Sequence, residues 1–123
     1  MANKSNIKGG EFLVKETKWQ EILIPEEFNE EQRMMAQTCR DFVQKEVIPH
    51  VEQLDKHDRE LLTKQLKRAG ELGLLAVSVP EEYAGFGQDF GTSMLVNEEM
   101  GQSFSFVVAF SAHTGIGIMP ILY

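Results

Sequence analysis

The sequence predicts an all-α fold, an orthogonal or up-down bundle of about five helices that follows an extended N-terminal arm. Two stretches, residues 29–54 and 58–72, carry apolar residues at three- and four-residue spacing, which is typical of helices with one buried face. A strand-like apolar run near residue 106 finds no partner strand elsewhere in the sequence. A helical architecture is therefore favoured over a mixed one.

The composition indicates one ordinary globular domain. The chain has 123 residues and a formal net charge of −7, which argues against a nucleic-acid-binding protein and against docking to an anionic membrane surface. Its single cysteine, Cys39, excludes an internal disulfide, and a small buried side chain is favoured over a reactive thiol. No apolar run is expected to approach the roughly 20 residues of a membrane span. The N-terminus lacks the apolar core of a signal peptide, so a cytoplasmic location is the default expectation.

Three parts are expected along the chain. Residues 1–10 are polar and end in glycine, which predicts a disordered leader. Residues 11–27 are interpreted as an extended arm that lays its apolar residues on the domain surface, and Pro25 should end it. Residues 28–123 form the predicted helical domain.

The first predicted helix has a clear start and an internal proline. Asn29 can cap the helix, and Gln32 stands three residues on, as in a capping box. Pro49 removes a backbone donor and should end or kink the helix. Because Val51 and Leu54 continue the apolar stripe, we expect a kink.

The middle of the chain predicts two further helices and a turn region. A second helix runs from about residue 58 to residue 72, and Gly73 should stop it in the left-handed conformation. Residues 74–79 suit either a strand or a buried extended connection. Residues 81–91 are rich in turn residues, and a third helix follows from about residue 92 to residue 101.

The C-terminal part is the most apolar. Residues 104–112 have strand propensity, but the helical context favours a buried helix. Residues 116–123 stay apolar to the last position, which is typical of a chain that ends inside a larger protein rather than at a domain boundary.

No catalytic, cofactor-binding or metal-binding residue is predicted within the chain. His50, His57 and His113 lack ligand spacing, and the acids around His57 are better explained as a solvated helix end than as a metal site. Glycines at 85, 87 and 91 give GxGxxxG, which favours a structural turn over a phosphate loop because the spacing and the missing basic residue do not fit.

Several short segments together resemble the N-terminal domain of the acyl-CoA dehydrogenase family over about residues 28–123. The segments are Phe28-Asn29-Glu30-Glu31-Gln32, Val47-Ile48-Pro49, Ala69-Gly70-Glu71-Leu72-Gly73-Leu74-Leu75, Val79-Pro80-Glu81-Glu82-Tyr83-Ala84-Gly85-Phe86-Gly87, Glu98-Glu99-Met100, and Ala112-His113 through Met119-Pro120-Ile121-Leu122. The arm Gly9-Gly10-Glu11-Phe12-Leu13, with Ala112-His113, further resembles the branch that handles long and very long acyl chains. Ala84 is a departure, since the family usually has glycine there.

The resemblance implies a three-part, FAD-dependent enzyme of fatty-acid β-oxidation. In that family FAD lies between a middle β-domain and a C-terminal helical domain, and a glutamate base takes the α-proton while hydride passes to the flavin. The base and nearly all flavin contacts would lie beyond Tyr123, so the 123-residue chain alone should be inactive and hold no FAD. The implied partners of the complete enzyme are acyl-CoA, electron-transfer flavoprotein and further copies of itself, with no nucleic acid and no transmembrane segment.

The resemblance also implies that the apolar helix near residue 108 forms one wall of the acyl-chain tunnel. The side chains expected on that wall share one helix face or follow it directly: Val108, Ser111, Ala112, Gly115 and Ile116. Plain packing against neighbouring helices is the alternative for these residues. Two alternatives stand against the enzyme: a stand-alone helical interaction module that uses residues 116–123, and a non-catalytic lipid-binding domain.

Overall fold

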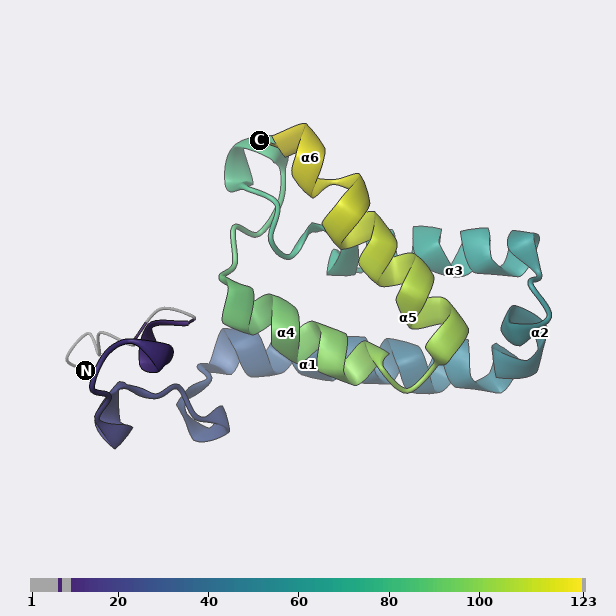
Figure 1. The fold of residues 1–123 in the computed structure, drawn as a ribbon. Helices are drawn as coiled ribbons and strands as arrows, with labels where there is room; N and C mark the ends of the chain where they lie inside the picture. The colour runs from purple at the N-terminus through teal and green to yellow at the C-terminus, as the bar shows by residue number, and fades with distance from the viewer. Residues whose placement is uncertain (1–6, 8–9, 123) are drawn as a thin grey trace. The chain divides into compact units, whose positions relative to one another are not determined.

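A computed structural model describes residues 7 and 10–122 of the chain (Figure 1). The described residues contain helices and no strand, so the all-α prediction is confirmed. Two compact units, residues 1–30 and 31–123, are treated separately below. The α-helices are α1 (Glu30–Phe42), α2 (Val51–Asp55), α3 (Arg59–Glu71), α4 (Phe90–Met100), α5 (Phe104–Ser111) and α6 (Met119–Leu122).

The N-terminal unit consists of three short 3-10 turns joined by extended residues. The turns are Glu11–Leu13, Trp19–Glu21 and Pro25–Glu27. Pro25 was expected to end the arm, but it begins the third turn, where its fixed φ suits the first helical position. The predicted leader at residues 1–10 lies mostly outside the described residues. Of those ten, Ile7 donates a backbone hydrogen bond to the Glu21 carbonyl at 3.2 Å.

Pro49 kinks the first helix and does not end it, as predicted. After α1 the chain passes through a π-helical turn (Val43–Val47) and a 3-10 turn (Ile48–His50) before α2. Proline has no backbone N–H to donate, and the change from a π turn before it to a 3-10 turn around it accommodates the missing hydrogen bond. The chain therefore stays helical through to Asp55.

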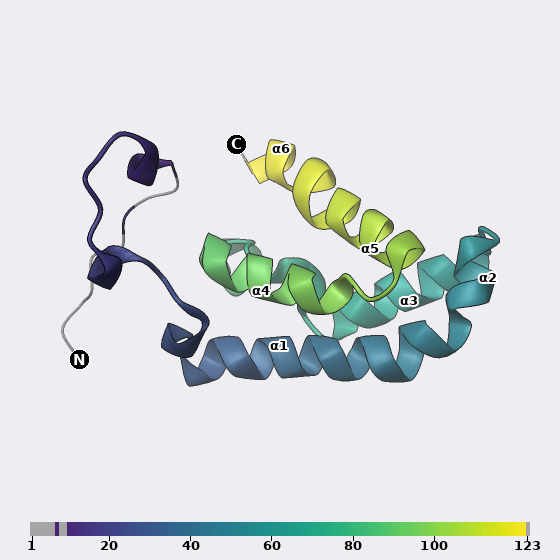
Figure 2. The same ribbon diagram turned by 60° about the horizontal axis from the view of Figure 1, so that its bottom comes forward.

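Helices α1 and α4 lie side by side and run in the same direction (Figures 1 and 2). Residue numbers on both helices rise together along the line of contacts, which fixes the parallel sense. The contacts are Gln32 Nε2 to Thr92 Oγ1 (2.8 Å), Cys39 Sγ to the Val96 carbonyl (3.3 Å), Arg40 Nη2 to Glu99 Oε1 (2.5 Å), and Gln44 to Gln102 beyond the end of α4.

The core fills the space between this pair and the helices that pack on it. Phe106 of α5 is fully buried, and its ring centroid lies 5.7 Å from that of Phe42 and 6.4 Å from that of Phe110. Aromatic pairs at this separation stabilise a core beyond simple area burial. Smaller side chains complete the cluster: Cys39, Val43, Val47, Leu54, Ala69, Leu74, Val77, Val96 and Met100.

Helix α3 begins and ends as the sequence predicts. The Asp58 carboxylate accepts a hydrogen bond from the Leu61 amide at 3.0 Å. Gly73 follows the helix with φ +77°, and a Cβ there would lie 2.5 Å from the Phe86 ring. Both the backbone conformation and the close ring require glycine at this position.

Residues 74–79 form neither of the two structures expected for them. They contain a 3-10 turn, Leu74–Ala76, whose backbone bonds close locally: the Ala76 amide donates to the Gly73 carbonyl at 3.0 Å. A strand or extended connection was expected because the run is short, apolar and ended by Pro80. Two of its residues, Leu74 and Val77, are buried. Burial alone does not distinguish strand from tight helix in so short a run.

The glycine-rich stretch is a structural turn, as predicted. A Cβ on Gly85 would lie 2.0 Å from the Val79 carbonyl oxygen, so no larger residue fits. The Gly87 amide donates to the same oxygen at 2.8 Å. Helix α4 then begins at Phe90, two residues earlier than predicted, because Asp89 accepts from the Thr92 amide at 2.8 Å and caps it.

Ala84 occupies the left-handed region with φ +62° in this turn. A Cβ in that conformation costs the folded state roughly 1–2 kcal/mol, which glycine avoids. Glycine also has more conformational freedom in the unfolded chain, and this offsets part of the stabilisation. We therefore expect Ala84→Gly to raise the free energy of unfolding by up to about 1 kcal/mol, measured by urea denaturation. Ala36→Gly, within α1, is the control and should lower it. A destabilised Ala84→Gly variant would contradict the strain.

The Arg40–Glu99 ion pair should make stability depend on pH. The hydrogen bond from Arg40 holds the pKa of Glu99 below its usual range. A lowered folded-state pKa contributes stability above the unfolded pKa, and that contribution is lost as pH falls through the folded value. The stability gap between the wild type and Arg40→Met should therefore be widest near neutral pH and close in acid. Thermal melts across that range check this, and the control Lys64→Met, exposed on α3, should show no such closing.

Candidate functional site

The C-terminal helical run has one buried and one exposed side. Figure 1 shows α5, the following turn and α6 as one continuous helical course. Phe106 and Phe110 of α5 face the core, whereas Phe104, Val108 and Ile116 are 82%, 56% and 82% exposed. The helix predicted for residues 104–112 is confirmed, but its complete burial was wrong. When a helix is apolar on all sides, the spacing of its apolar residues does not indicate which side faces the core.

Between α5 and α6 the helix widens into a π-helix, Ala112–Gly117. Its closing bond runs from the Ile118 amide to the His113 carbonyl at 3.1 Å, five residues back. In an α-helix, residues four apart are displaced around the axis because one turn holds only 3.6 residues. A π turn holds more residues, so it displaces residues four apart in the opposite sense. Val108, Ala112 and Ile116 consequently form a nearly straight row of exposed side chains.

A groove of about 650 Å³ lies along the adjacent side of the same run, between α4, α5 and the segment after α3. Its walls are mainly apolar. They include Leu75, Val77, Phe90, Met94, Val107 and Phe110. Gly115 also lines it, and a Cβ there would meet no heavy atom within 4 Å, so the groove is open at this point.

Three polar side chains in the groove have hydrogen-bond partners within the protein. The Asn97 side-chain amide donates to the Ser93 carbonyl at 2.9 Å, and its Oδ1 accepts from Ser111 Oγ at 3.2 Å. Thr114 Oγ1 donates to the Phe110 carbonyl at 3.0 Å. Since these groups already have partners, an apolar occupant would leave none of them newly unpaired.

The five predicted wall residues are divided between these two surfaces. Ser111 and Gly115 line the groove, while the other three form the exposed row. Their contact with an acyl chain stays a prediction. Asn97 was not identified from the sequence as a residue of this groove. A signal was present, because Asn97 stands four residues after Ser93 on a helix with buried apolar residues, a spacing that allows polar contacts within a helix.

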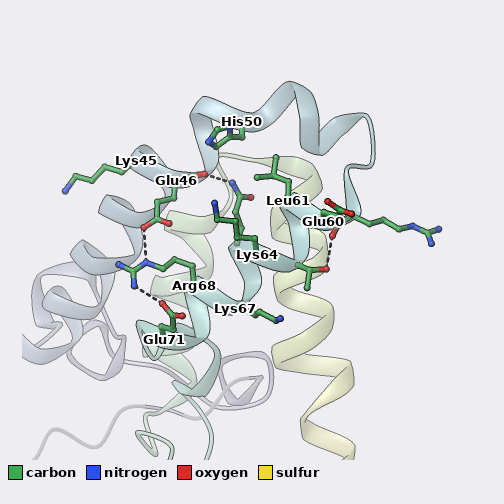
Figure 3. A pocket seen from close by; sticks show the side chains of 12 residues that line it. Lys45, Glu46, His50, Glu60, Leu61, Lys64, Lys67, Arg68 and Glu71 are labelled. Carbon is green, nitrogen blue, oxygen red and sulfur yellow. Dashed lines mark hydrogen bonds and ion pairs between the residues drawn. The ribbon is translucent and has the colours of Figure 1, made fainter.

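A second cavity, of about 830 Å³, lies beside α3 and carries charged groups (Figure 3). Arg68 bridges Glu46 at 3.1 Å and Glu71 at 2.9 Å, and the Gln65 side chain donates to the Glu46 carbonyl. Figure 3 shows the Lys45 side chain pointing away from this cluster. Glu46, Arg68 and Glu71 pair with one another and Lys45 points away from them, so this surface is the weaker candidate.

Cys39 has a structural role. It is fully buried, and burial, together with the charge of Glu99, raises the pKa of its thiol to about 12. A thiol that stays protonated at neutral pH is a poor nucleophile. Within the described part of the chain, no three His, Cys, Asp or Glu side chains are grouped to hold a metal ion.

The run Phe104–Leu122 is longer than the sequence suggested. Its 19 residues are helical and mostly apolar, so length and composition alone would allow it to cross a membrane. The expectation that no apolar run approaches this length was wrong because the helix continues across Gly115 and Gly117. Helices that another part of a protein covers meet the same criterion, which makes this weak evidence for a span.

Residues 29–123 match the family model of the acyl-CoA dehydrogenase N-terminal domain. The chain belongs to the acyl-CoA dehydrogenase family. A probable acyl-CoA dehydrogenase of Bacillus subtilis (strain 168) is 40% identical over 116 residues, which are 94% of this chain and 20% of that protein. The crystal structure of an acyl-CoA dehydrogenase complexed with FAD from Bacillus anthracis superposes with a TM-score of 0.86 at 44% identity, covering 93% of this chain and 20% of that one.

The relatives of this acyl-CoA dehydrogenase domain do not select one chain-length branch. The mitochondrial short-chain specific acyl-CoA dehydrogenase of Rattus norvegicus is 39% identical over 107 residues, 86% of this chain and 25% of that protein. The resemblance to the long-chain branch stays a prediction. This chain spans about a fifth to a quarter of the length of these relatives. Family membership favours the enzyme hypothesis over a stand-alone interaction or lipid-binding module.

The exposed apolar side chains should make the 123-residue chain self-associate. Ile116 and Ile121 are 82% and 85% exposed, and contiguous apolar surface of this kind is removed from water at roughly 25 cal/mol per Å². Light scattering over a dilution series should show the mass rising with concentration. The double change Ile116→Ser and Ile121→Ser should suppress it, whereas Met34→Ser, at an exposed site on α1, should not. A monomeric mass at every concentration would contradict the expectation.

Proposed function

We propose that this chain is the N-terminal part of a FAD-dependent acyl-CoA dehydrogenase, and that the exposed side of α5 and the π-helix forms one wall of its acyl-chain tunnel. The observation that carries the proposal is the row Val108, Ala112 and Ile116, which is apolar and open to solvent on a helix of this family's N-terminal domain. The FAD-bound structural relative supports the cofactor.

The row suits a hydrocarbon chain for physical reasons. Its side chains are apolar and carry no hydrogen-bonding group, so a methylene that contacts them loses only its contact with water. Each methylene buried in this way contributes roughly 0.8 kcal/mol to binding. Because Ala112 is the smallest of the three, it leaves the most depth at the centre of the row.

The reaction that we propose for the complete enzyme is α,β-dehydrogenation of an acyl-CoA, in which FAD supplies the hydride acceptor. We assign neither a FAD contact nor the catalytic base to this chain. The glycine-rich turn at residues 85–87 is occupied by its own backbone contacts and offers no cradle for a phosphate. The role left to this chain is to bind the acyl tail, orient it and exclude water from it.

The complete enzyme would pass its electrons to an electron-transfer flavoprotein and work as a homo-oligomer in the cytoplasm. The first two proposals rest on the family resemblance of the sequence, whereas the cytoplasmic location is only its default expectation. The acyl tunnel has direct support from side chains of this chain, and so it is the part that substitutions in this domain can test.

Enlarging Ala112 should shorten the range of substrates that the complete enzyme accepts. Ala112→Leu adds three carbons to the row, so blocking room for about three methylenes would cost roughly 2.4 kcal/mol of binding to long chains alone. We expect kcat/KM to fall for long acyl-CoAs and to hold for short ones.

The control is Ala69→Leu, the same substitution at a fully buried core position. It should lower the melting temperature through overpacking, at a cost of about 1–3 kcal/mol, without sorting substrates by length. If Ala112→Leu also reduces kcat/KM equally at all lengths, in step with the melting temperature, Ala112 is a packing residue and the tunnel wall lies elsewhere.

A further inference from the structure

We infer that Asn97 is a positioning residue, which ties the C-terminal end of α5 to α4 and so determines which side chains of the following π-helix face outward. The inference rests on the proposed function, because the outward row is the proposed tunnel wall. It concerns a contact between two helices, Asn97 to Ser111, which no spacing rule on either helix reveals.

Asn97 is a polar residue at a position of α4 that faces a mainly apolar groove. It is half-buried in the groove next to Val96 and Met94. Burying a side-chain amide costs free energy unless both its oxygen and its nitrogen find partners. Here the nitrogen donates to the Ser93 carbonyl and the oxygen accepts from Ser111. The amide is thus bonded at both ends, once within α4 and once across to α5.

The Ser111 hydroxyl makes an uncommon choice of partner. Hydroxyls within helices usually donate to the carbonyl four residues back, as Thr38, Thr63 and Thr114 do in this protein. Ser111 donates instead to α4. It is also the last residue of α5, so the contact is made at the point where α geometry gives way to π geometry.

Apolar packing fixes the rotation of α5 as far as Phe110, because Phe106 and Phe110 are buried in the core. From Ser111 to Leu122 no residue is buried, so apolar packing defines the direction of this part only weakly, and a polar contact at Ser111 can set it. A single directional hydrogen bond is known to select one register among apolar alternatives in paired helices. At the other end of α5, Ser105 Oγ donates to Asp55 at 2.5 Å and ties the helix to α2.

The rotation matters because Ala112 directly follows Ser111. If the tie is lost, the π-helix can turn relative to α4, and the row Val108, Ala112 and Ile116 no longer keeps one direction. Asn97 then acts on the acyl chain without touching it, through the orientation of its neighbours.

Hydrogen–deuterium exchange of the 123-residue chain tests the tie directly. Asn97→Leu, which keeps the size but loses the amide, and Ser111→Ala should each speed exchange at the Gly117 and Ile118 amides roughly fivefold, the effect of one neutral hydrogen bond. The double variant should exchange no faster than either single one, because both remove the same bond. Ser111→Thr keeps the hydroxyl and should retain the slow exchange. Ser105→Ala removes the other tie of α5 and should leave these amides unchanged.

Acyl-CoA kinetics of the complete enzyme then test the consequence. Asn97→Leu should raise KM for long acyl-CoAs severalfold while kcat holds, and Ser111→Thr should keep the wild-type length profile. Two results would overturn the inference and leave the proposed tunnel intact. One is that the exchange effects of the two single variants add in the double variant. The other is that Asn97→Leu leaves the KM profile unchanged while Ala112→Leu does discriminate by chain length. A failure of Ala112→Leu to sort by length counts against the tunnel itself.

Discussion

The parallel contact between α1 and α4 is the constraint on which the rest of this domain depends. It brings together segments about 60 residues apart through two buried contacts, Gln32 to Thr92 and Cys39 to Val96, followed by two exposed polar pairs, Arg40 with Glu99 and Gln44 with Gln102. Thr92 is fully buried and yet fully bonded, because Asp89 caps α4 with the same carboxylate that accepts the Thr92 hydroxyl. The start of α4 and its alignment with α1 are therefore set by one group of side chains.

The position of α5, which follows α4, depends on this alignment. The chain leaves α4 at Gly101 and enters α5 three residues later, so there is little freedom in where α5 begins. Phe106 and Phe110 then fill the core, which leaves the other side of the same helix without cover. An apolar surface thus results from a helix whose burial is complete on one side and absent on the other.

The sequence predicted the elements whose signals are local, and it did not predict those that depend on distant contacts. The left-handed Gly73 and the kink at Pro49 each follow from the chemistry of one or two residues. The 3-10 turn after α3 and the exposed side of α5 depend on what lies beside them, which spacing does not encode. The candidate site divides in the same way: the helix and its small residues were predicted, but the bond between Asn97 and Ser111 joins two helices and could not be.

The π-helix at Ala112–Gly117 has a consequence for how this family can vary. Such a segment is an α-helix that has accommodated one surplus residue. Deleting one residue between Ala112 and Ile116 would restore α geometry. Ile116 would then stand seven residues after Val108 and not eight, and positions seven apart lie on one face of an α-helix, so Ile116 would stay in the row. A change of one codon in length, with no substitution at all, would thus be absorbed here without remodelling the surface.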